Sequence, residues 1–185
     1  EQYSLGVGTN ALNSETSGGG NVALGEDALT KVSTGDWNVA VGYGAGDETT
    51  TGEANTFLGT FAGGSSVGGQ SGAARNVYVG YAAGHSTSGS RNVAVGYTAL
   101  SATSVTAQYN VAVGYSALES ATSGNGNVCL GYSAGSNLTT GDDNIIIGYD
   151  AQASAVDVED EITIGNANIT AFRIPGIDLE ATSGV

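Results

Sequence analysis

The sequence is poor in the residues on which enzymes and disulfide-bonded domains commonly depend. Its 185 residues include one Cys, one Pro, one Trp, one His and no Met. A single Cys excludes a disulfide within the chain, and Cys129 is best read as a small buried filler. His85 alone leaves no Ser/His/Asp or Cys/His arrangement to assemble, and it lies in a polar connector. We therefore expect no enzyme activity, no catalytic residues and no cofactor.

Basic residues and long apolar runs are also scarce. Lys and Arg together number four against 18 Asp and Glu, which gives a formal net charge of −14. Such a chain repels nucleic-acid phosphates and anionic lipids, and no apolar run approaches the roughly 18 residues of a membrane span. We expect neither nucleic-acid binding nor membrane insertion. The chain begins with Glu1 rather than Met and shows no signal-peptide pattern, which suggests a piece of a longer or processed protein.

What the sequence has in abundance is glycine and a strict internal repeat. It contains 31 Gly, yet 40% of its residues are hydrophobic and recur regularly, which indicates an ordered chain. The segment Asn92–Tyr97 (Asn-Val-Ala-Val-Gly-Tyr) returns unchanged as Asn110–Tyr115. Ten such units succeed one another at a usual spacing of 17 residues. They start at Ser4, Asn21, Asn38, Asn55, Asn76, Asn92, Asn110, Asn127, Asn144 and Glu161.

One unit is longer than the others, by four residues, because a Gly- and Ser-rich loop is inserted near 64–75. An insertion that leaves the repeat register intact is typical of a solenoid. We therefore predict an all-β fold, a parallel β-roll of about ten coils over residues 1–169, with a C-terminal extension at 170–185. Stacking at the strand spacing of ~4.8 Å would make a rod about 45 Å long.

Each unit reads as a short strand followed by turns. Its second and fourth positions are aliphatic, apart from Thr56, and this alternation predicts that they form the buried face. The fifth position is Gly in all ten units, which indicates a turn, and the eighth is Ala in nine. The Asn at the first position predicts a hydrogen-bonded ladder along one corner. Its members are Asn21, Asn38, Asn55, Asn76, Asn92, Asn110, Asn127 and Asn144.

The third position carries no charge in any unit, although the alternation predicts that it points away from the coil interior. An uncharged row on an outer face needs a cover, and three rolls side by side would supply it. We therefore expect a homotrimer. The interface residues on this interpretation are Ala40, Phe57, Tyr78, Ala94, Ala112, Cys129 and Ile146.

Tyrosines recur at the sixth position and would form a column of rings. Packing at a coil corner is one interpretation of this column. The other is a platform for host glycan rings, formed by Tyr81, Tyr97, Tyr115 and Tyr132. The acidic pairs and runs, such as Asp142-Asp143, do not recur at fixed repeat positions, so we assign no metal site to them.

The repeats resemble those of bacteriophage tail fibre shafts, and they are similar to the head domains of trimeric autotransporter adhesins. The resemblance rests on the Asn-Val-Ala-Val-Gly-Tyr unit and covers residues 4 to about 169. It implies a homotrimeric, left-handed β-roll. The stretch Glu161–Asn166, followed by Thr170–Gly176, resembles the lead-in to the self-cleaving intramolecular chaperone of phage fibres and endosialidases.

These features predict a structural fibre protein of a phage tail, located in the virion and involved in attachment to a host glycan or protein receptor. The alternative is a cell-surface trimeric adhesin or extracellular filament subunit. A free-standing ice-binding solenoid is the third hypothesis. It is disfavoured because Thr49-Thr50-Thr51 and Thr139-Thr140 do not form an unbroken Thr-x-Thr row.

Overall fold

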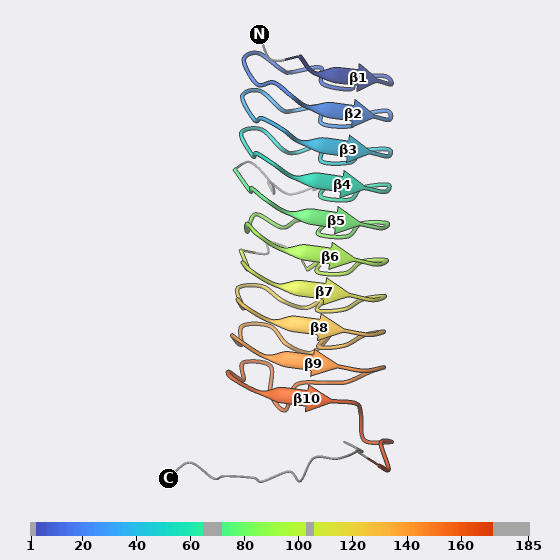
Figure 1. Cartoon of the computed structure of the whole chain (residues 1–185), viewed down its shortest axis with the longest axis vertical. Helices are drawn as coiled ribbons and strands as arrows, with labels where there is room; N and C mark the ends of the chain where they lie inside the picture. Colours follow the sequence, from blue (N-terminus) through green and yellow to red (C-terminus); the bar gives the residue numbers. More distant parts are fainter. Residues whose placement is uncertain (1–2, 65–71, 103–105, 172–185) are drawn as a thin grey trace, which may run out of the picture.

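The computed structural model describes residues 3–64, 72–102 and 106–171, and this part of the chain forms ten short β-strands in one sheet. The strands are β1 (Leu5–Val7), β2 (Val22–Leu24), β3 (Val39–Val41), β4 (Thr56–Leu58), β5 (Val77–Val79), β6 (Val93–Val95), β7 (Val111–Val113), β8 (Val128–Leu130), β9 (Ile145–Ile147) and β10 (Ile162–Ile164). Each strand pairs in parallel with the next, so the chain climbs as a β-solenoid of about nine turns (Figure 1). The predicted all-β, parallel repeat architecture is confirmed.

The long repeat does not disturb this stacking. Residues 65–71 of the predicted insertion lie outside the described residues. On either side of them, Thr56 of β4 still pairs with Val77 of β5, and Leu58 pairs with Val79. The coils before and after the insertion therefore share one register.

A glycine ends every strand because no side chain fits there. Gly114 has a φ of 138°, and a Cβ built on it would lie 2.2 Å from the carbonyl oxygen of Gly131 in the next coil. A side chain would be disfavoured by the backbone conformation and excluded by the neighbouring coil. The invariant Gly is thus required by the stacking itself.

The turns after the strands are also ordered coil by coil. Thr98 and Ser116, two residues after the glycine, have φ values of 49° and 50°. This left-handed conformation costs a non-glycine residue about 1 kcal/mol. Backbone hydrogen bonds to the preceding coil hold it, because Thr98 N donates to Tyr81 O and Ser116 N to Tyr97 O, each at 2.9 Å.

The interior of each coil is thin and admits one side chain per strand. The middle residues of β2 to β9 point into it and have no exposed surface. They are Ala23, Ala40, Phe57, Tyr78, Ala94, Ala112, Cys129 and Ile146. The alanines at the eighth repeat position are buried in the same core cluster, which explains why they are so regular.

This arrangement corrects the sequence-based assignment of the two strand faces. Ala40, Phe57, Tyr78, Ala94, Ala112, Cys129 and Ile146 are core residues of one chain, so assigning them to a trimer interface was wrong. Side chains alternate along a strand, so when the middle residue points inward its two neighbours point outward. A coil interior lined by Ala has no room for two Val, Leu or Ile side chains per strand. The larger aliphatic residues therefore lie outside.

In several coils the core compensates bulk between two positions. Where the strand supplies Ala94, the turn supplies the buried Leu100 six residues later. Where the strand supplies Tyr78, the turn supplies Gly84, and a Cβ there would lie 2.3 Å from the Tyr78 ring. Coil three departs from this pairing, because Ala40 is followed by Gly46, and there the Phe57 and Leu29 side chains of the adjacent coils fill the space.

Cys129 illustrates the closed interior and gives a test of it. Its side chain is fully buried, and burial raises the pKa of its thiol to about 12. Because the thiolate is the reactive form, we expect iodoacetamide to leave Cys129 unmodified until the chain is denatured. The exposed site Ser123 supplies the control, since a Ser123→Cys thiol should react at once. Rapid native labelling of Cys129 would contradict a dry, closed core.

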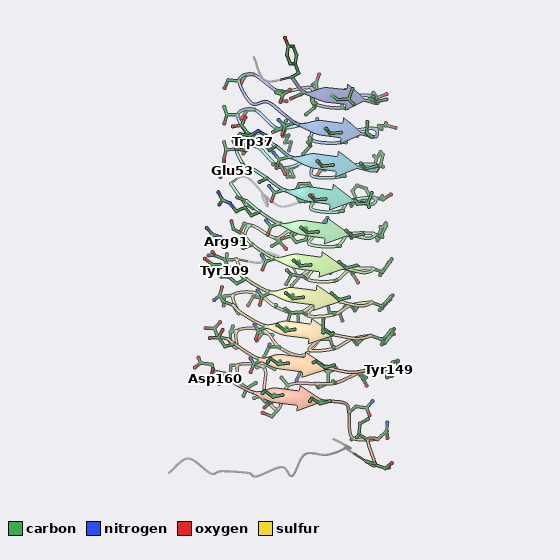
Figure 2. All side chains as sticks on the ribbon, viewed as in Figure 1. Trp37, Glu53, Arg91, Tyr109, Tyr149 and Asp160 are labelled. Carbon is green, nitrogen blue, oxygen red and sulfur yellow. The ribbon has the colours of Figure 1, made fainter. Side chains whose placement is uncertain are left out.

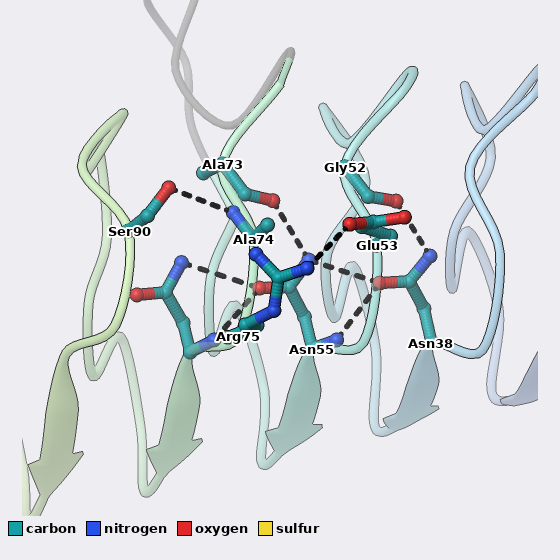
Figure 3. Close-up of polar contacts among 9 residues, drawn as sticks. Asn38, Gly52, Glu53, Asn55, Ala73, Ala74, Arg75 and Ser90 are labelled. Carbon is teal, nitrogen blue, oxygen red and sulfur yellow. Dashed lines mark hydrogen bonds and ion pairs between the residues drawn. The ribbon is translucent and has the colours of Figure 1, made fainter.

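The asparagines at the first repeat position form a continuous buried ladder. Asn55 Nδ2 donates to Asn38 Oδ1 at 2.9 Å and to the carbonyl of Ala73 at 2.9 Å, and Asn55 N also donates to Asn38 Oδ1 at 3.0 Å (Figure 3). The backbone N–H to Oδ1 bond recurs along the ladder, from Asn38 to Asn144. The ladder thus ties each coil both to itself and to its neighbour, with its polar atoms satisfied.

A carboxylate stands at each end of the ladder. Asn21 Nδ2 donates to Glu15 Oε1 at 2.6 Å, and Ser4 Oγ donates to the same oxygen at 2.8 Å. In the last coil Glu161 replaces Asn, and its Oε1 accepts from Thr163 Oγ1 at 2.6 Å and from Ser154 N at 3.0 Å. The hydrogen bonds from Ser154 and Thr163 lower the pKa of Glu161.

This lowered pKa predicts a pH effect confined to the last coil. A carboxyl whose pKa is depressed in the folded state stabilises that state at neutral pH, and the effect is lost as the pH falls through the folded pKa, below 4.5. We expect hydrogen exchange around Ser154 and Thr163, corrected for the intrinsic rate, to accelerate between pH 6 and pH 3. Glu161→Gln should remove this acceleration. An identical pH response in both proteins would contradict the role of Glu161.

Candidate functional site

The outward face of the sheet is an uninterrupted apolar surface, here called the outer stripe. It consists of the first and third residues of each strand, for which Val113 is 37% exposed, Ile147 37% and Leu58 47%. In β2 to β9 these residues are Val22, Leu24, Val39, Val41, Thr56, Leu58, Val77, Val79, Val93, Val95, Val111, Val113, Val128, Leu130, Ile145 and Ile147. None is charged, and Thr56 is the one polar member of this set.

The outer stripe is too regular to be incidental surface. Two rows of side chains running over nine strand spacings cover on the order of 500 Å², comparable with the largest apolar patches of monomers, which are often functional. When one face of a sheet is exposed to water, that face usually carries polar residues. This stripe carries no charged residue in β2 to β9, although its side chains reach solvent.

Charged side chains gather elsewhere. Figure 2 shows Trp37, Glu53, Arg91, Tyr109 and Asp160 along the corner where the chain enters the strands, and Tyr149 at the opposite corner. The corner before the strands thus carries an Arg75–Glu53 ion pair of 2.9 Å, and another pair joins Lys31 to Glu48. Exposed pairs of this kind contribute little stability, because water screens the charges. Their position leaves the outer stripe free of charge.

The tyrosines of the sixth position form a stacked column, which is the second notable surface. Adjacent rings from Tyr81 through Tyr97, Tyr115 and Tyr132 to Tyr149 have centroids 5.0 to 5.1 Å apart and planes within 14°. Both faces of Tyr97, Tyr115 and Tyr132 are therefore covered by neighbouring rings. The sequence-based idea that these three rings offer faces to glycans does not fit this geometry, since only their edges reach solvent.

The column breaks at one coil. Coil four has Thr60 at the sixth position, and Phe61 at the seventh fills part of the gap. The Phe61 ring stands at 85° to both Tyr43 and Tyr81, with centroids 5.2 and 6.3 Å away. Tyr81 consequently has a parallel neighbour on one face only.

The His, Cys, Asp and Glu side chains are dispersed over the described residues. These residues contain no group of three or more His, Cys, Asp and Glu side chains placed to hold a metal ion. His85 is half-buried, and burial lowers its pKa, so its ring is uncharged at neutral pH. Ser86 Oγ lies 3.0 Å from His85 Nδ1. No helix that could cross a membrane occurs in the ranges that the structure covers.

The chain was compared with family models, with curated proteins and with solved structures, and none of them matches it. The outer stripe and the tyrosine column are the surfaces of the rod that bear on its function.

Proposed function

We propose that this chain is a structural fibre protein of a phage tail, in which three copies form a rigid shaft that takes part in host attachment. The observation that carries the proposal is the outer stripe, a charge-free surface of Val, Leu and Ile, with Thr56, that is partly exposed along the rod. The assignment to a phage rather than to a cell-surface adhesin or filament is supported by the resemblance of the repeats to fibre shafts.

Further copies of the same chain are the best partners for the outer stripe. Its side chains recur at the strand spacing of ~4.8 Å, so a surface that interdigitates with them along the full rod needs the same period. Another copy of this chain has the same period, because its strands stack at the same spacing. Parallel rods also bring matching coils together, so Thr56, the polar member, would meet its own copies rather than valines.

Three copies suit the shape of the rod. The outer stripe occupies one face, and a threefold axis parallel to the rod turns three such faces inward around one apolar core. The left-handed trimeric roll implied by the resemblance has this arrangement. The tyrosine column and the charged corner lie at the edges of the strands, so they would remain accessible on the outside of the shaft.

Such an assembly would be stiff. Parallel pairing, the asparagine ladder and the turn-to-turn backbone bonds all connect neighbouring coils, so bending the rod would break several of them at once. Stiffness is what a spacer between a particle and its host requires.

Electron microscopy tests the rod itself, and the neighbouring genes separate the proposed fibre from its alternative. Electron microscopy of the purified chain should show short straight rods about 45 Å long. The genes beside the coding sequence should encode virion structural proteins. A secretion signal and a membrane anchor in the same reading frame would instead favour the cell-surface adhesin.

A further inference from the structure

A cavity lies beside the break in the tyrosine column, where coil four carries Thr60 and Phe61. Its volume is about 630 Å³, within the range of small-ligand sites, about 300–1,000 Å³. Its lining comes from four successive coils and includes Asp47, Glu48, Phe61, Tyr81 and His85. Thr98 and Ser101 complete the polar wall. The cavity thus combines aromatic rings with carboxylate, imidazole and hydroxyl groups.

Thr60 explains why an aromatic surface is available in this place. Tyr97, Tyr115 and Tyr132 are each covered on both faces by parallel rings of the neighbouring coils. Thr60 supplies no ring, and Phe61 is perpendicular to Tyr81 rather than stacked on it. Phe61 therefore stands edge-on beside Tyr81, which is 46% exposed like the stacked Tyr97, and both rings line the cavity.

The polar groups of the cavity are held in place by the rod. Glu48 Oε1 accepts from Lys31 Nζ at 2.5 Å, which offsets its charge. Thr98 Oγ1 and Ser116 Oγ lie 3.0 Å apart, and Ser86 Oγ positions the His85 ring. The cavity therefore offers hydrogen-bond acceptors and donors at fixed places beside its aromatic surface, with little net charge of its own.

We propose that this cavity binds one or two rings of a neutral saccharide. The C–H face of a sugar ring packs on aromatic carbon, and its hydroxyls require both acceptors, such as Asp47, and donors, such as Thr98. The chain's net charge of −14 disfavours sialic and uronic acids. The inference rests on the proposed function, because attachment to a host makes a surface glycan the natural ligand. It specifies that this glycan is neutral.

A cationic ligand is the main competitor, because two rings near a carboxylate also suit an alkylammonium group. The structure favours the sugar for two reasons. Glu48 is already paired with Lys31, and the wall formed by His85, Thr98 and Ser101 offers neutral hydrogen-bonding groups that a quaternary ammonium cannot use.

The test is ligand-observed NMR of the full chain with lactose, maltose, cellobiose and diacetylchitobiose. Tetramethylammonium and N-acetylneuraminic acid serve as cationic and anionic probes. We expect at least one neutral disaccharide to bind with a Kd of about 1 mM or tighter. The double variant Thr60→Tyr/Phe61→Ser gives coil four the Tyr-Ser pair of coils seven and eight, Tyr115-Ser116 and Tyr132-Ser133. It should complete the stack, keep the melting temperature and abolish binding.

The reverse exchange is the matched control. Tyr132→Thr/Ser133→Phe breaks the column away from the cavity and should leave the Kd unchanged. Asp47→Asn, which preserves shape, should weaken binding at least tenfold. Binding by tetramethylammonium alone, no binding by any disaccharide, or full binding by the filled variant would overturn the saccharide site. A sample with the mass of three chains that binds no sugar would overturn this site and leave the proposed fibre standing.

Discussion

Val113→Lys should convert the assembled protein into a folded monomer. Val113 lies on the outer stripe and is 37% exposed, so a single chain tolerates a lysine there. In the assembly the same lysine would be buried in an apolar interface beside its own copies, at a cost of several kcal/mol per charge. Light scattering should report 18.2 kDa, and circular dichroism should keep its β signal.

Two further lysine variants make this test specific. Ala112→Lys changes the next residue, which is fully buried inside the coil, and should abolish folding rather than assembly. Val156→Lys replaces a valine that is 51% exposed and lies outside the outer stripe. This variant should change neither the folding nor the assembly of the protein. If Ala112→Lys folds normally while Val113→Lys unfolds, the assignment of the two strand faces is wrong.

Asn110→Ala should be among the most destabilising single changes that remove no charge. Asn110 Nδ2 donates to the carbonyl of Gly124 at 2.9 Å, and Asn110 Oδ1 accepts from Asn127 N at 2.9 Å and from Asn127 Nδ2 at 3.2 Å. Alanine would leave the Gly124 carbonyl and the Asn127 N–H without these hydrogen bonds, at about 1–3 kcal/mol each, so we expect a loss of roughly 2–6 kcal/mol. Asn127 Nδ2 keeps its bond to the Gly141 carbonyl. Denaturant unfolding of the Val113→Lys monomer background measures this loss without the contribution of assembly.

The control for the ladder is an asparagine that the fold does not bury. Asn13 is exposed in the first coil, and Asn13→Ala should change the unfolding free energy by less than about 0.5 kcal/mol. Equal effects of the two substitutions would mean that the ladder is an ordered feature with no energetic role.

The sequence predicted the repeat, the coil period and the positions of the corners because each of these is fixed by one backbone requirement. Gly114 marks a turn in which a Cβ would strike the next coil, and Asn110 marks a corner where one side chain must bond two coils. Such requirements leave an invariant residue at an invariant spacing. They can therefore be read without coordinates.

The direction of the strand faces could not be read in the same way. Alternation shows that two faces differ, and the regular aliphatic residues at the second and fourth positions favour placing that face inside, which the structure contradicts. The signal that identifies the interior is the exchange of bulk between the third and ninth positions, seen in Ala94 with Leu100 and Tyr78 with Gly84. Two positions that compensate in volume face the same space.

The cavity lay beyond sequence reasoning for a related reason. A column of tyrosines is visible in the repeats, but whether the rings present faces or edges depends on their stacking geometry. Thr60 and Phe61 looked like ordinary variation within the repeat. Their meaning appears only once the rings above and below them are placed.

The molar mass of the purified chain in solution, measured by light scattering, tests most directly whether the outer stripe joins copies of this protein. We predict three times 18.2 kDa, stable on dilution to low micromolar concentration. A mass of twice 18.2 kDa would support self-association of the chain but contradict the threefold arrangement. A stable monomer of 18.2 kDa with the outer stripe exposed to water would contradict the account of this protein as a trimeric fibre shaft.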